Sequence, residues 1–313
     1  MSSIEKAIER LAKNKSEKSK GNDATTLAAG VEAREKTAIP ASKAPEQGAA
    51  IAAKPAVTLN KDKGKEQPPA RRSKAKKILL DYESLSKVGH IVPHSGNNQL
   101  AEEYRVIKRP LIMNALGKGA APIEHGNLIS VSSSLPSEGK TFTALNLALS
   151  ISTELDSTVL LVDGDVLRYS LSKLLGLENE KGLIDLLEDK NCTVGDVILE
   201  TQIPRLKLIA AGKRSQKSTE LFASKEMDDL LDELAERYKN RIVIFDSPPI
   251  LPTSESTVLN HHMGQIVVVV EAGKTPVEAI KDTLSRLDQE KAIGLVLNKS
   301  REAKGENYYG TYY

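Results

Sequence analysis

One short run of residues in this sequence has the composition of a phosphate-binding loop. Residues 134–141 read SLPSEGKT and fit the pattern G-x-x-x-x-G-K-[ST], except that Ser134 stands at the first glycine. Such a loop, placed between a strand and a helix, turns backbone N–H groups and the positive end of the helix dipole toward phosphate. Lys140 can then reach the β- and γ-phosphates, and the Thr141 hydroxyl can ligate Mg²⁺. The alternative, a chance Gly-Lys-Thr in an ordinary turn, is disfavoured by the apolar run before it and the helical pattern after it.

Two apolar runs farther along the chain end in acidic residues. The first run leads into Asp163 and Asp165, and the second leads into Asp246. Carboxylates beside bound phosphates can hold Mg²⁺ directly or through water, and one of them can accept the proton of an attacking hydroxyl. A helix cap or a turn explains one such acid alone, but acids at two strand ends favour a catalytic site. Arg168 fits a phosphate-balancing role and a surface ion pair about equally.

The surrounding sequence alternates between strand and helix patterns. We expect strands at 128–132, 158–162, 206–210, 241–245, 266–270 and 293–297. Helices are expected at 99–116, 141–154, 170–175, 182–189, 218–238, 254–262 and 275–289, with Pro110 kinking or ending the first half of its helix. Several strands are continuous apolar runs, which is typical of parallel strands buried on both faces. We therefore predict an α/β fold: a P-loop NTPase with a doubly wound, mostly parallel sheet flanked by helices. Ligands bind such sheets at the carboxyl ends of the strands, where these polar residues lie.

Composition sets limits on partners and compartment. The chain has 313 residues, with 44 basic and 42 acidic side chains, so no net field favours nucleic acid or a membrane surface, and we expect no nucleic-acid partner. The single cysteine, Cys192, cannot form an internal disulfide, which fits a reducing compartment. No apolar run approaches the ~20 residues that a membrane span needs, and the N-terminus lacks the apolar region of a secretory signal. The sequence thus predicts a cytoplasmic protein.

The chain divides into four expected segments. Residues 1–14 have apolar side chains at helical spacing and predict a short amphipathic helix, either solvated or used for docking. Residues 15–76 are rich in Lys, Ala, Glu, Gly and Pro and contain no aromatic residue, which predicts a disordered linker. The α/β domain is expected at 77–303 and a flexible, tyrosine-rich tail at 304–313.

The tail holds an unusual share of the tyrosines. The chain has 8 of them, and the last six positions include Tyr308, Tyr309, Tyr312 and Tyr313. A polar segment that contains glycine offers these rings no core to pack into. Tyrosines on a flexible end can enter the active site of a neighbouring molecule, so we interpret these four as phosphoryl acceptors.

Three motifs resemble those of the bacterial tyrosine kinases (BY-kinases). They are the phosphate loop at 132–141, the acidic motif at 160–165 and the strand with its double proline at 242–249. The resemblance covers roughly residues 96–313 and is strongest to the autokinases of exopolysaccharide synthesis that accompany the exosortase system. It implies an ATP- and Mg²⁺-dependent protein tyrosine autokinase that phosphorylates its C-terminal tyrosine cluster in trans.

The resemblance also implies roles for individual residues. Lys140, Asp163 and Asp165 would be catalytic, with Asp163 as the base. Magnesium would be held by Thr141, Asp165 and Asp246. The nucleotide would contact a larger set: Ser134, Pro136, Ser137, Glu138, Gly139, Lys140, Thr141, Phe142 and Asn298. Of these, Asn298 is similar to a family position near the adenine, although asparagine at a strand end is also a common turn residue.

Two kinds of partner are implied by the same resemblance. Residues 102–108 resemble the E-x-x-R-x-x-R helix motif that mediates ring-like homo-oligomers, with Glu102, Arg105 and Lys108 at its three positions. Their spacing of three predicts a shared helix face, for which a solvated charged face is the alternative. The family's third position is arginine, whereas here lysine stands there and Arg109 follows. A separate membrane activator of the polysaccharide chain-length type is the second implied partner, and it would bring the chain to the periphery of the inner membrane.

Two other functions compete with this interpretation. One is a switch ATPase of the cell-division or plasmid-partition type, but those proteins carry a lysine at the second loop position, where this chain has Leu135. The other is a non-catalytic regulator that binds nucleotide only structurally. The retained Lys140, Asp163 and Asp246 argue against it, because simple binding needs no positioned base.

Overall fold

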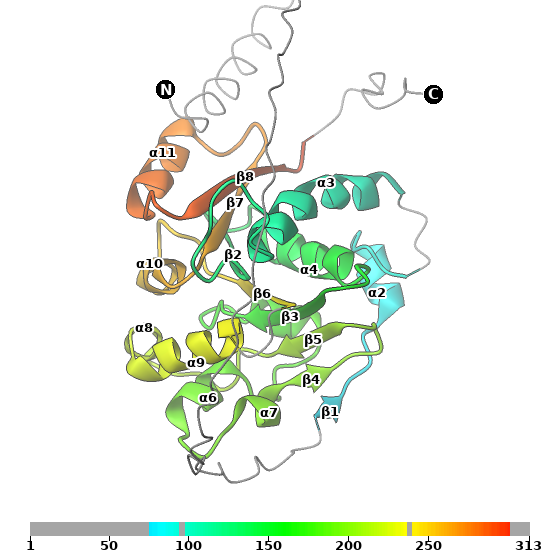
Figure 1. The fold of residues 1–313 in the computed structure, drawn as a ribbon, viewed down its shortest axis with the longest axis vertical. Helices are drawn as coiled ribbons and strands as arrows, with labels where there is room; N and C mark the ends of the chain where they lie inside the picture. Colours follow the sequence, from blue (N-terminus) through cyan, green and yellow to red (C-terminus); the bar gives the residue numbers. More distant parts are fainter. Residues whose placement is uncertain (1–74, 94–97, 237–239, 301–313) are drawn as a thin grey trace, which may run out of the picture. The chain divides into compact units, whose positions relative to one another are not determined.

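The computed structural model describes residues 75–93, 98–236 and 240–300. Within these residues the strands form one sheet of eight, in the order β1-β4-β5-β3-β6-β2-β7-β8 (Figure 1). The strands are β1 Lys76–Lys77, β2 Leu128–Ser133, β3 Thr158–Asp163, β4 Leu199–Glu200, β5 Leu206–Ile209, β6 Arg241–Asp246, β7 Gln265–Glu271 and β8 Ala292–Asn298. Neighbouring strands pair in parallel, except for the antiparallel pair β4–β5. The predicted mostly parallel α/β sheet is confirmed.

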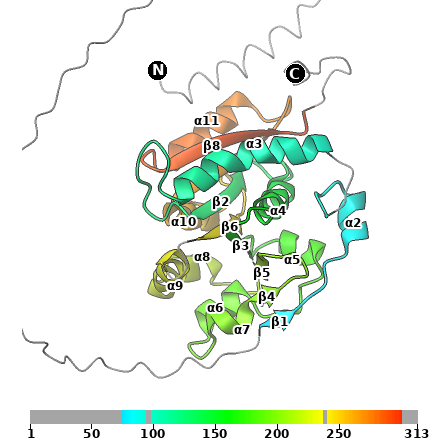
Figure 2. The ribbon, with the colours of Figure 1, turned by 45° about the vertical axis from the view of Figure 1, so that its right-hand side comes forward.

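Helices cover both faces of this sheet (Figures 1 and 2). They are α2 Tyr82–Lys87, α3 Asn98–Ala115, α4 Lys140–Ile151, α5 Ser170–Leu174, α6 Leu183–Glu188, α7 Val194–Val197, α8 Ser218–Phe222, α9 Lys225–Glu236, α10 Ser254–His261 and α11 Val277–Arg286. Helices α2 to α5 contribute to one hydrophobic core, and α6 to α11 contribute to a second core. The sheet therefore lies between two helical layers, as a doubly wound fold requires.

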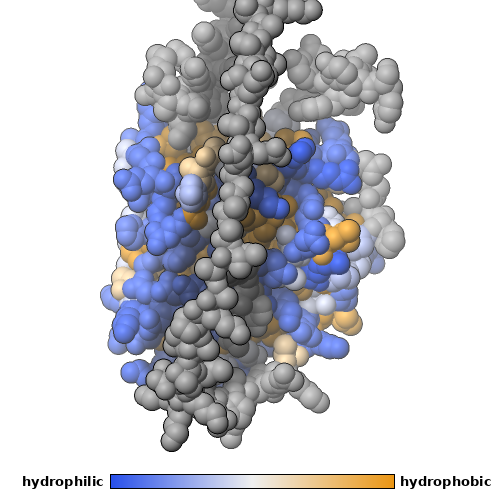
Figure 3. Space-filling view, in the orientation of Figure 1, coloured by the Kyte–Doolittle hydropathy of each residue, from blue (hydrophilic) through white to orange (hydrophobic). Residues whose placement is uncertain are grey.

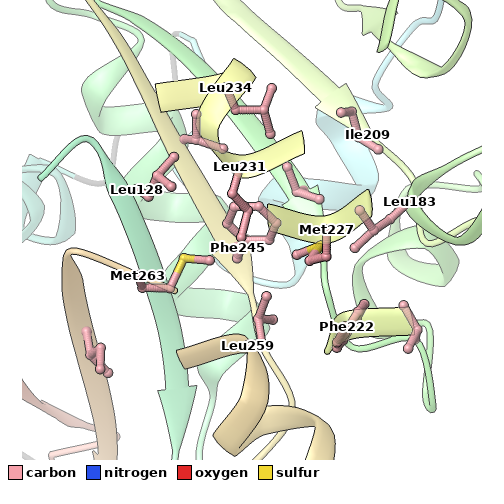
Figure 4. Packing of buried hydrophobic residues seen from close by; sticks show 14 of the residues in the cluster. Leu128, Leu183, Ile209, Phe222, Met227, Leu231, Leu234, Phe245, Leu259 and Met263 are labelled. Atoms are coloured by element: carbon pink, nitrogen blue, oxygen red, sulfur yellow. The ribbon is translucent and has the colours of Figure 1, made fainter. Parts of the chain in front are cut away.

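The central strands supply side chains to both cores. In β2, β3 and β6, Leu128, Leu160 and Phe245 belong to the core under α6–α11, whereas their neighbours Ile129, Leu161 and Ile244 belong to the core under α2–α5. Figure 4 shows the Phe245 ring surrounded by Met227 and Leu231 of α9, Leu259 of α10 and Met263, which follows α10. Successive strand side chains point to opposite faces, so burial on both faces explains why these strands are continuous apolar runs.

The structure corrects several predicted element boundaries. The helix expected over 218–238 is divided into α8 and α9, because α8 ends at Phe222 and the Ser224 hydroxyl accepts the N–H of Met227 at the start of α9. Pro110 lies inside α3, which continues to Ala115. The short elements β1, β4 and α7 were not predicted. Strand β1 begins at Lys76, one residue before the expected domain start, and pairs with β4.

Some predicted segments cannot be compared with the structure. The helix at 1–14, the linker up to residue 74 and the tail at 304–313 lie outside the described residues. Among the described helices, none has the length and apolar character needed to cross a membrane. On the face seen in Figure 3, the coloured residues are mainly hydrophilic, with hydrophobic residues between them.

Candidate active site

The predicted site residues meet at the carboxyl edge of the sheet. Strands β3, β6 and β2 are neighbours, and Asp163 at the end of β3 lies directly opposite Asp246 at the end of β6. The phosphate loop follows β2, and Lys140 is the first residue of α4. The topology therefore brings three segments that are far apart in the sequence to one place, as the strand-end rule predicts.

The phosphate loop is shaped by its own side chains. Glu138 is buried, and its carboxylate accepts the N–H of Leu135 at 2.7 Å and the hydroxyl of Thr275. This side chain is thus used to hold the loop closed and is not available to a nucleotide, so only the backbone of Glu138 fits the predicted binding role. The residue after it, Gly139, has a φ of 100°, which few residues other than glycine adopt.

The end of β8 lies against the loop. Asn298 donates a hydrogen bond to the carbonyl of Glu138 at 2.9 Å, and a Cβ added at Gly139 would lie 2.0 Å from Asn298 Nδ2. Lys299 donates to the carbonyl of Ser137 at 2.7 Å and forms an ion pair with Glu271. Asn298 therefore positions the loop, a role that the sequence did not predict.

Ser134 stands where the general pattern has glycine. It is fully buried, and its hydroxyl accepts a hydrogen bond from Thr283 of α11 at 2.8 Å. The side chain is accommodated between the loop and α11, which explains how serine can replace the glycine here.

Lys140 is paired with one of the predicted acids. Its Nζ lies 2.6 Å from Oδ2 of Asp165, and both side chains are buried. Burial alone would lower the pKa of Lys140, but the carboxylates of Asp246 and Asp165 outweigh it and raise the pKa. The lysine is therefore held in its charged form beside the loop.

Asp163 has well-defined hydrogen-bond donors. Its Oδ2 accepts the backbone N–H of Ser172 at 2.8 Å and the Ser172 hydroxyl at 2.7 Å, and its Oδ1 accepts the N–H of Asp165 at 3.2 Å. Desolvation raises the pKa of Asp163 to about 6, although the hydrogen bonds from Ser172 act in the opposite direction. Ser172 was missed by sequence reasoning, because a serine in a short helix matches no motif.

Asp246 differs from the other two acids in its hydrogen bonding. It is completely buried, and neither of its carboxylate oxygens receives a hydrogen bond of normal geometry from the described residues. Desolvation raises its pKa to about 7, while Lys140, and to a smaller degree the Thr141 hydroxyl, favour the charged form. A buried carboxylate without such a partner is costly.

The side chains predicted to bind magnesium are of the types that Mg²⁺ requires. Asp246 supplies an unpartnered carboxylate, Asp165 supplies a second one, and Thr141 supplies a hydroxyl, which are the oxygen ligands that Mg²⁺ prefers. In the part of the chain that the structure describes, no group of three or more His, Cys, Asp or Glu side chains is arranged to hold a metal by itself. Oxygen atoms of phosphate and water would have to complete the coordination, as is usual for Mg²⁺ at nucleotide sites.

The remaining predicted residues that the structure describes form no hydrogen bond or ion pair with the three acids. Phe142 follows Thr141 in α4, and its ring centroid lies 4.8 Å from that of His90. Pro136 and Ser137 belong to the loop, where Ser137 has a φ of 69°. The tyrosines Tyr308, Tyr309, Tyr312 and Tyr313 lie outside the described residues.

Helix α3 does not present its three predicted residues on one exposed face. Glu102 and Arg105 are exposed and form an ion pair with one another. Lys108 is buried; it donates to the carbonyl of Ser150 at 2.7 Å and pairs with Glu154 at 2.6 Å, just beyond the end of α4. At ~100° per residue, Lys108 points about 120° away from Glu102, whereas Arg109 points within about 20° of it. The exposed charged face therefore includes Arg109 in place of Lys108.

A comparison with protein-family models matches residues 126–296 to the AAA domain (AAA_31). The match includes the phosphate loop and all three acids. The chain belongs to the AAA domain family. The matched residues 126–296 do not include β1 or residues 102–109 of α3.

Curated relatives and solved structures agree with this assignment. The AAA domain protein is 33% identical over 174 residues to the tyrosine-protein kinase ptk of Acinetobacter johnsonii, covering 55% of this chain and 23% of that relative. It is 28% identical over 216 residues to the tyrosine-protein kinase YwqD of Bacillus subtilis, covering 67% and 86%. The kinase domain of the Escherichia coli tyrosine kinase ETK has the same fold, with a TM-score of 0.57, 23% identity, and coverage of 76% and 94%.

These comparisons confirm the resemblance to bacterial tyrosine kinases that the motifs indicated. The chain spans only about a quarter of the length of the first curated relatives that it matches, 23% and 26%. It corresponds to nearly the whole of shorter relatives such as YwqD.

Proposed function

We propose that this chain is an ATP-dependent protein tyrosine autokinase that phosphorylates the tyrosines at its C-terminus in trans. The observation that carries the proposal is the group formed by Lys140, Asp163, Asp165 and Asp246 at the carboxyl edge of β3, β6 and β2. The names of its relatives support the same activity, since they are called tyrosine-protein kinases.

Nucleotide binding is supported by the loop and by the unpartnered acid. Mg-ATP, when bound, supplies the phosphoryl group that is transferred. The backbone N–H groups of the loop and the ammonium of Lys140 would bind the phosphates, while Thr141, Asp165 and Asp246 would hold the magnesium ion. Lys140, which contacts Asp165 in this structure, would neutralise phosphate charge.

Asp163 is the best-supported general base. At neutral pH a carboxyl with a pKa of about 6 is mostly ionised and can accept the proton of a tyrosine hydroxyl, and a base poised near the working pH is favourable for catalysis. Its hydrogen bonds from Ser172 fix the carboxylate in one orientation. Its neighbour Asp165 is assigned to the magnesium ion, which leaves Asp163 for the tyrosine hydroxyl.

Assembly into a ring-like homo-oligomer would bring the tail of one copy to the site of the next. The exposed face of α3, with Glu102, Arg105 and Arg109, is the surface that we assign to this contact. A separate membrane activator of the polysaccharide chain-length type would hold the chain at the inner membrane. Control of exopolysaccharide synthesis or export is the process in which we place it.

The activity is tested by intact-mass analysis and phosphotyrosine detection on purified protein with Mg-ATP. Three forms are compared: the full chain, Lys140→Met, and a chain truncated after Gly305. Phosphate on the full chain that is absent from both variants supports an autokinase acting through Lys140 on the tail. ATP hydrolysis without phosphotyrosine, even with a membrane activator supplied, would instead indicate the switch ATPase, and loss of both reactions would indicate the non-catalytic regulator.

A further inference from the structure

A basic loop lies beside the proposed active site. Residues 210–217 follow β5, the neighbour of β3 in the sheet, and contain Lys213, Arg214 and Lys217, all exposed. The segment after β3 adds the exposed Arg168. Lys213, Arg214 and Lys217 have no role in the nucleotide site described above, and for Arg168 the sequence left open a phosphate-balancing role and a surface ion pair.

The two segments touch through Tyr169. Its hydroxyl donates to the carbonyl of Lys213 at 3.2 Å, and the guanidinium carbon of Arg214 lies 5.3 Å from the centroid of its ring. The backbone N–H of Arg168 donates to Oδ1 of Asp165 at 3.2 Å, and the other oxygen of Asp165 holds Lys140. These contacts connect Lys140 to Arg214 through Asp165 and the adjacent residues Arg168 and Tyr169.

The loop is held in one conformation by hydrogen bonds at both ends. The N–H of Ala211 donates to the Ser172 hydroxyl at 3.0 Å, and the N–H of Lys213 donates to Asp185 at 3.2 Å. At the other end, the Ser215 hydroxyl donates to Glu188 at 2.7 Å and accepts the N–H of Lys217 at 3.2 Å. A ligand would not have to order this loop, and such preorganisation favours binding.

The charges of the loop are only partly neutralised. Lys213 forms an ion pair with Glu188 at 2.9 Å. Within the described ranges, Arg168 and Lys217 have no side-chain hydrogen bond or ion pair, and the side-chain contact of Arg214 is with the Tyr169 ring. Arg214 is thus placed on an aromatic face with its N–H donors unused, an arrangement suited to bind a phosphate.

We propose that Arg168, Arg214 and Lys217 form an acceptor-side binding site for phosphotyrosine in the C-terminal segment of a second copy of this chain. The site, here called the acceptor-side basic site, rests on the proposed kinase function, because its ligand is the product of that reaction. Arginine binds phosphate through paired, charge-assisted hydrogen bonds, and the Tyr169–Arg214 contact fixes where the guanidinium lies.

The sequence of the C-terminal segment explains why the phosphorylated form is the ligand. Residues 301–313 contain two basic residues, Arg301 and Lys304, and two acidic residues, Glu302 and Glu306. These side-chain charges balance, so the unmodified segment has little attraction for a basic surface. The first phosphate adds about −1.5 to −2 charge. A site that binds this phosphotyrosine would keep the segment at the active site while the next tyrosine is modified.

The test is a binding titration with two labelled peptides of residues 301–313, one unmodified and one phosphorylated at Tyr312. The full chain is first dephosphorylated and then saturated with Mg-ADP, so that the phosphate loop is not open to the peptide phosphate. We expect the phosphorylated peptide to bind at least about tenfold more tightly, the factor that ~1.4 kcal/mol produces. In Arg214→Gln/Lys217→Gln, this preference should fall to about twofold or less.

The matched control is Lys118→Gln/Lys281→Gln, which removes two exposed lysines elsewhere and should keep the full preference. Lys217→Gln alone is the second test variant, and it should reduce the preference in part. The proposed site would be overturned if the native chain bound the two peptides equally tightly. It would also be overturned if both loop variants kept the full preference for the phosphorylated peptide. The titration requires no phosphoryl transfer, so a chain that binds the phosphorylated peptide but never phosphorylates itself would refute the kinase function and leave this site standing.

Discussion

Ser172 holds the proposed base, Asp163, through its backbone N–H and its hydroxyl. A substitution can remove only the hydroxyl. Ser172→Ala deletes the 2.7 Å hydrogen bond to Asp163 and the acceptor for the N–H of Ala211. We expect the maximal rate of autophosphorylation to fall roughly tenfold, the size of one lost charge-assisted hydrogen bond, while KM for ATP changes little. Ser172→Thr, which restores the hydroxyl, should recover most of the rate.

A purely structural role for Ser172 predicts a different result. In that case KM and the maximal rate would change together, and Ser172→Thr would not restore the rate. Steady-state kinetics at several ATP concentrations distinguish the two outcomes.

The buried acids predict how stability depends on pH. In the folded chain without nucleotide or metal, the pKa values of Asp163 and Asp246 are raised to about 6 and about 7, above their value of 3.8 in the unfolded chain. Between these values the two acids bind more protons in the folded state, so their contribution to the free energy of unfolding falls as pH rises through roughly pH 4 to 7. Burial lowers the pKa of His90 and of His262, and the contribution of these histidines has the opposite sign.

Asp246→Asn should reduce this pH dependence and raise stability near pH 8, because it removes a buried charge. The measurement is urea unfolding in EDTA at pH 5, 6, 7 and 8, for the native chain and the variant. A pH dependence of stability that is the same in the native chain and in Asp246→Asn would contradict the assigned pKa shift of Asp246.

At the residue scale, sequence reasoning found the residues that belong to local motifs. Lys140, Thr141 and Asp246 could be predicted because a short spacing or a strand end identifies each of them. The functions of Ser172 and Asn298 could not be predicted in full, because both depend on which strands become neighbours. The nucleotide contact predicted for Glu138 stays a prediction for its backbone, and the use of its carboxylate to hold the loop together left no signal in the sequence.

At the element scale, α3 separates two charged residues that are adjacent in the sequence. Lys108 joins α3 to the end of α4, while Arg109 is exposed. We expect Lys108→Ala to lower the free energy of unfolding by about 1–3 kcal/mol, because it removes the charge-assisted hydrogen bond to the carbonyl of Ser150 and the ion pair with Glu154. Thermal unfolding measures this loss.

Arg109→Ala is the matched comparison on the same helix. It should change stability by less than about 0.5 kcal/mol, as surface substitutions usually do, yet shift sedimentation toward smaller species if α3 forms the contact between copies. The assignment fails if Lys108→Ala leaves stability unchanged, or if Arg109→Ala leaves the oligomeric state of the full chain unchanged.

Helix and strand patterns predicted most elements but not the short ones. Long apolar strands such as β2, β3 and β6 are recognisable because burial on both faces leaves a continuous run. The division between α8 and α9 was missed because only two residues, Ala223 and Ser224, interrupt the helical pattern. The two-residue strands β1 and β4 exist through pairing with each other and with β5, and such pairing leaves no periodic signal.

At the scale of the whole molecule, the proposed reaction needs two copies of the chain. The acids at the edge of the sheet belong to one copy, and the proposed acceptors, Tyr308 to Tyr313, lie at the far end of the sequence. The α/β class and the position of the site could be predicted, because the carboxyl ends of parallel strands lie at one edge of the sheet whatever the strand order. Contacts between copies could not, because they depend on which side chains remain exposed after folding.

Transfer between copies is the central claim. The most direct test mixes two variants, neither of which is expected to phosphorylate C-terminal tyrosines of its own. The full chain carrying Lys140→Met has a tail but no phosphate-loop lysine, and the chain truncated after Gly305 has the lysine but no tail. They are incubated together with Mg-ATP, and intact mass is recorded for each. The account predicts phosphate on the Lys140→Met chain in the mixture and none on it alone. A mixture in which the Lys140→Met chain stays unmodified, while the unaltered full chain becomes phosphorylated at every dilution at the same rate, would contradict transfer in trans.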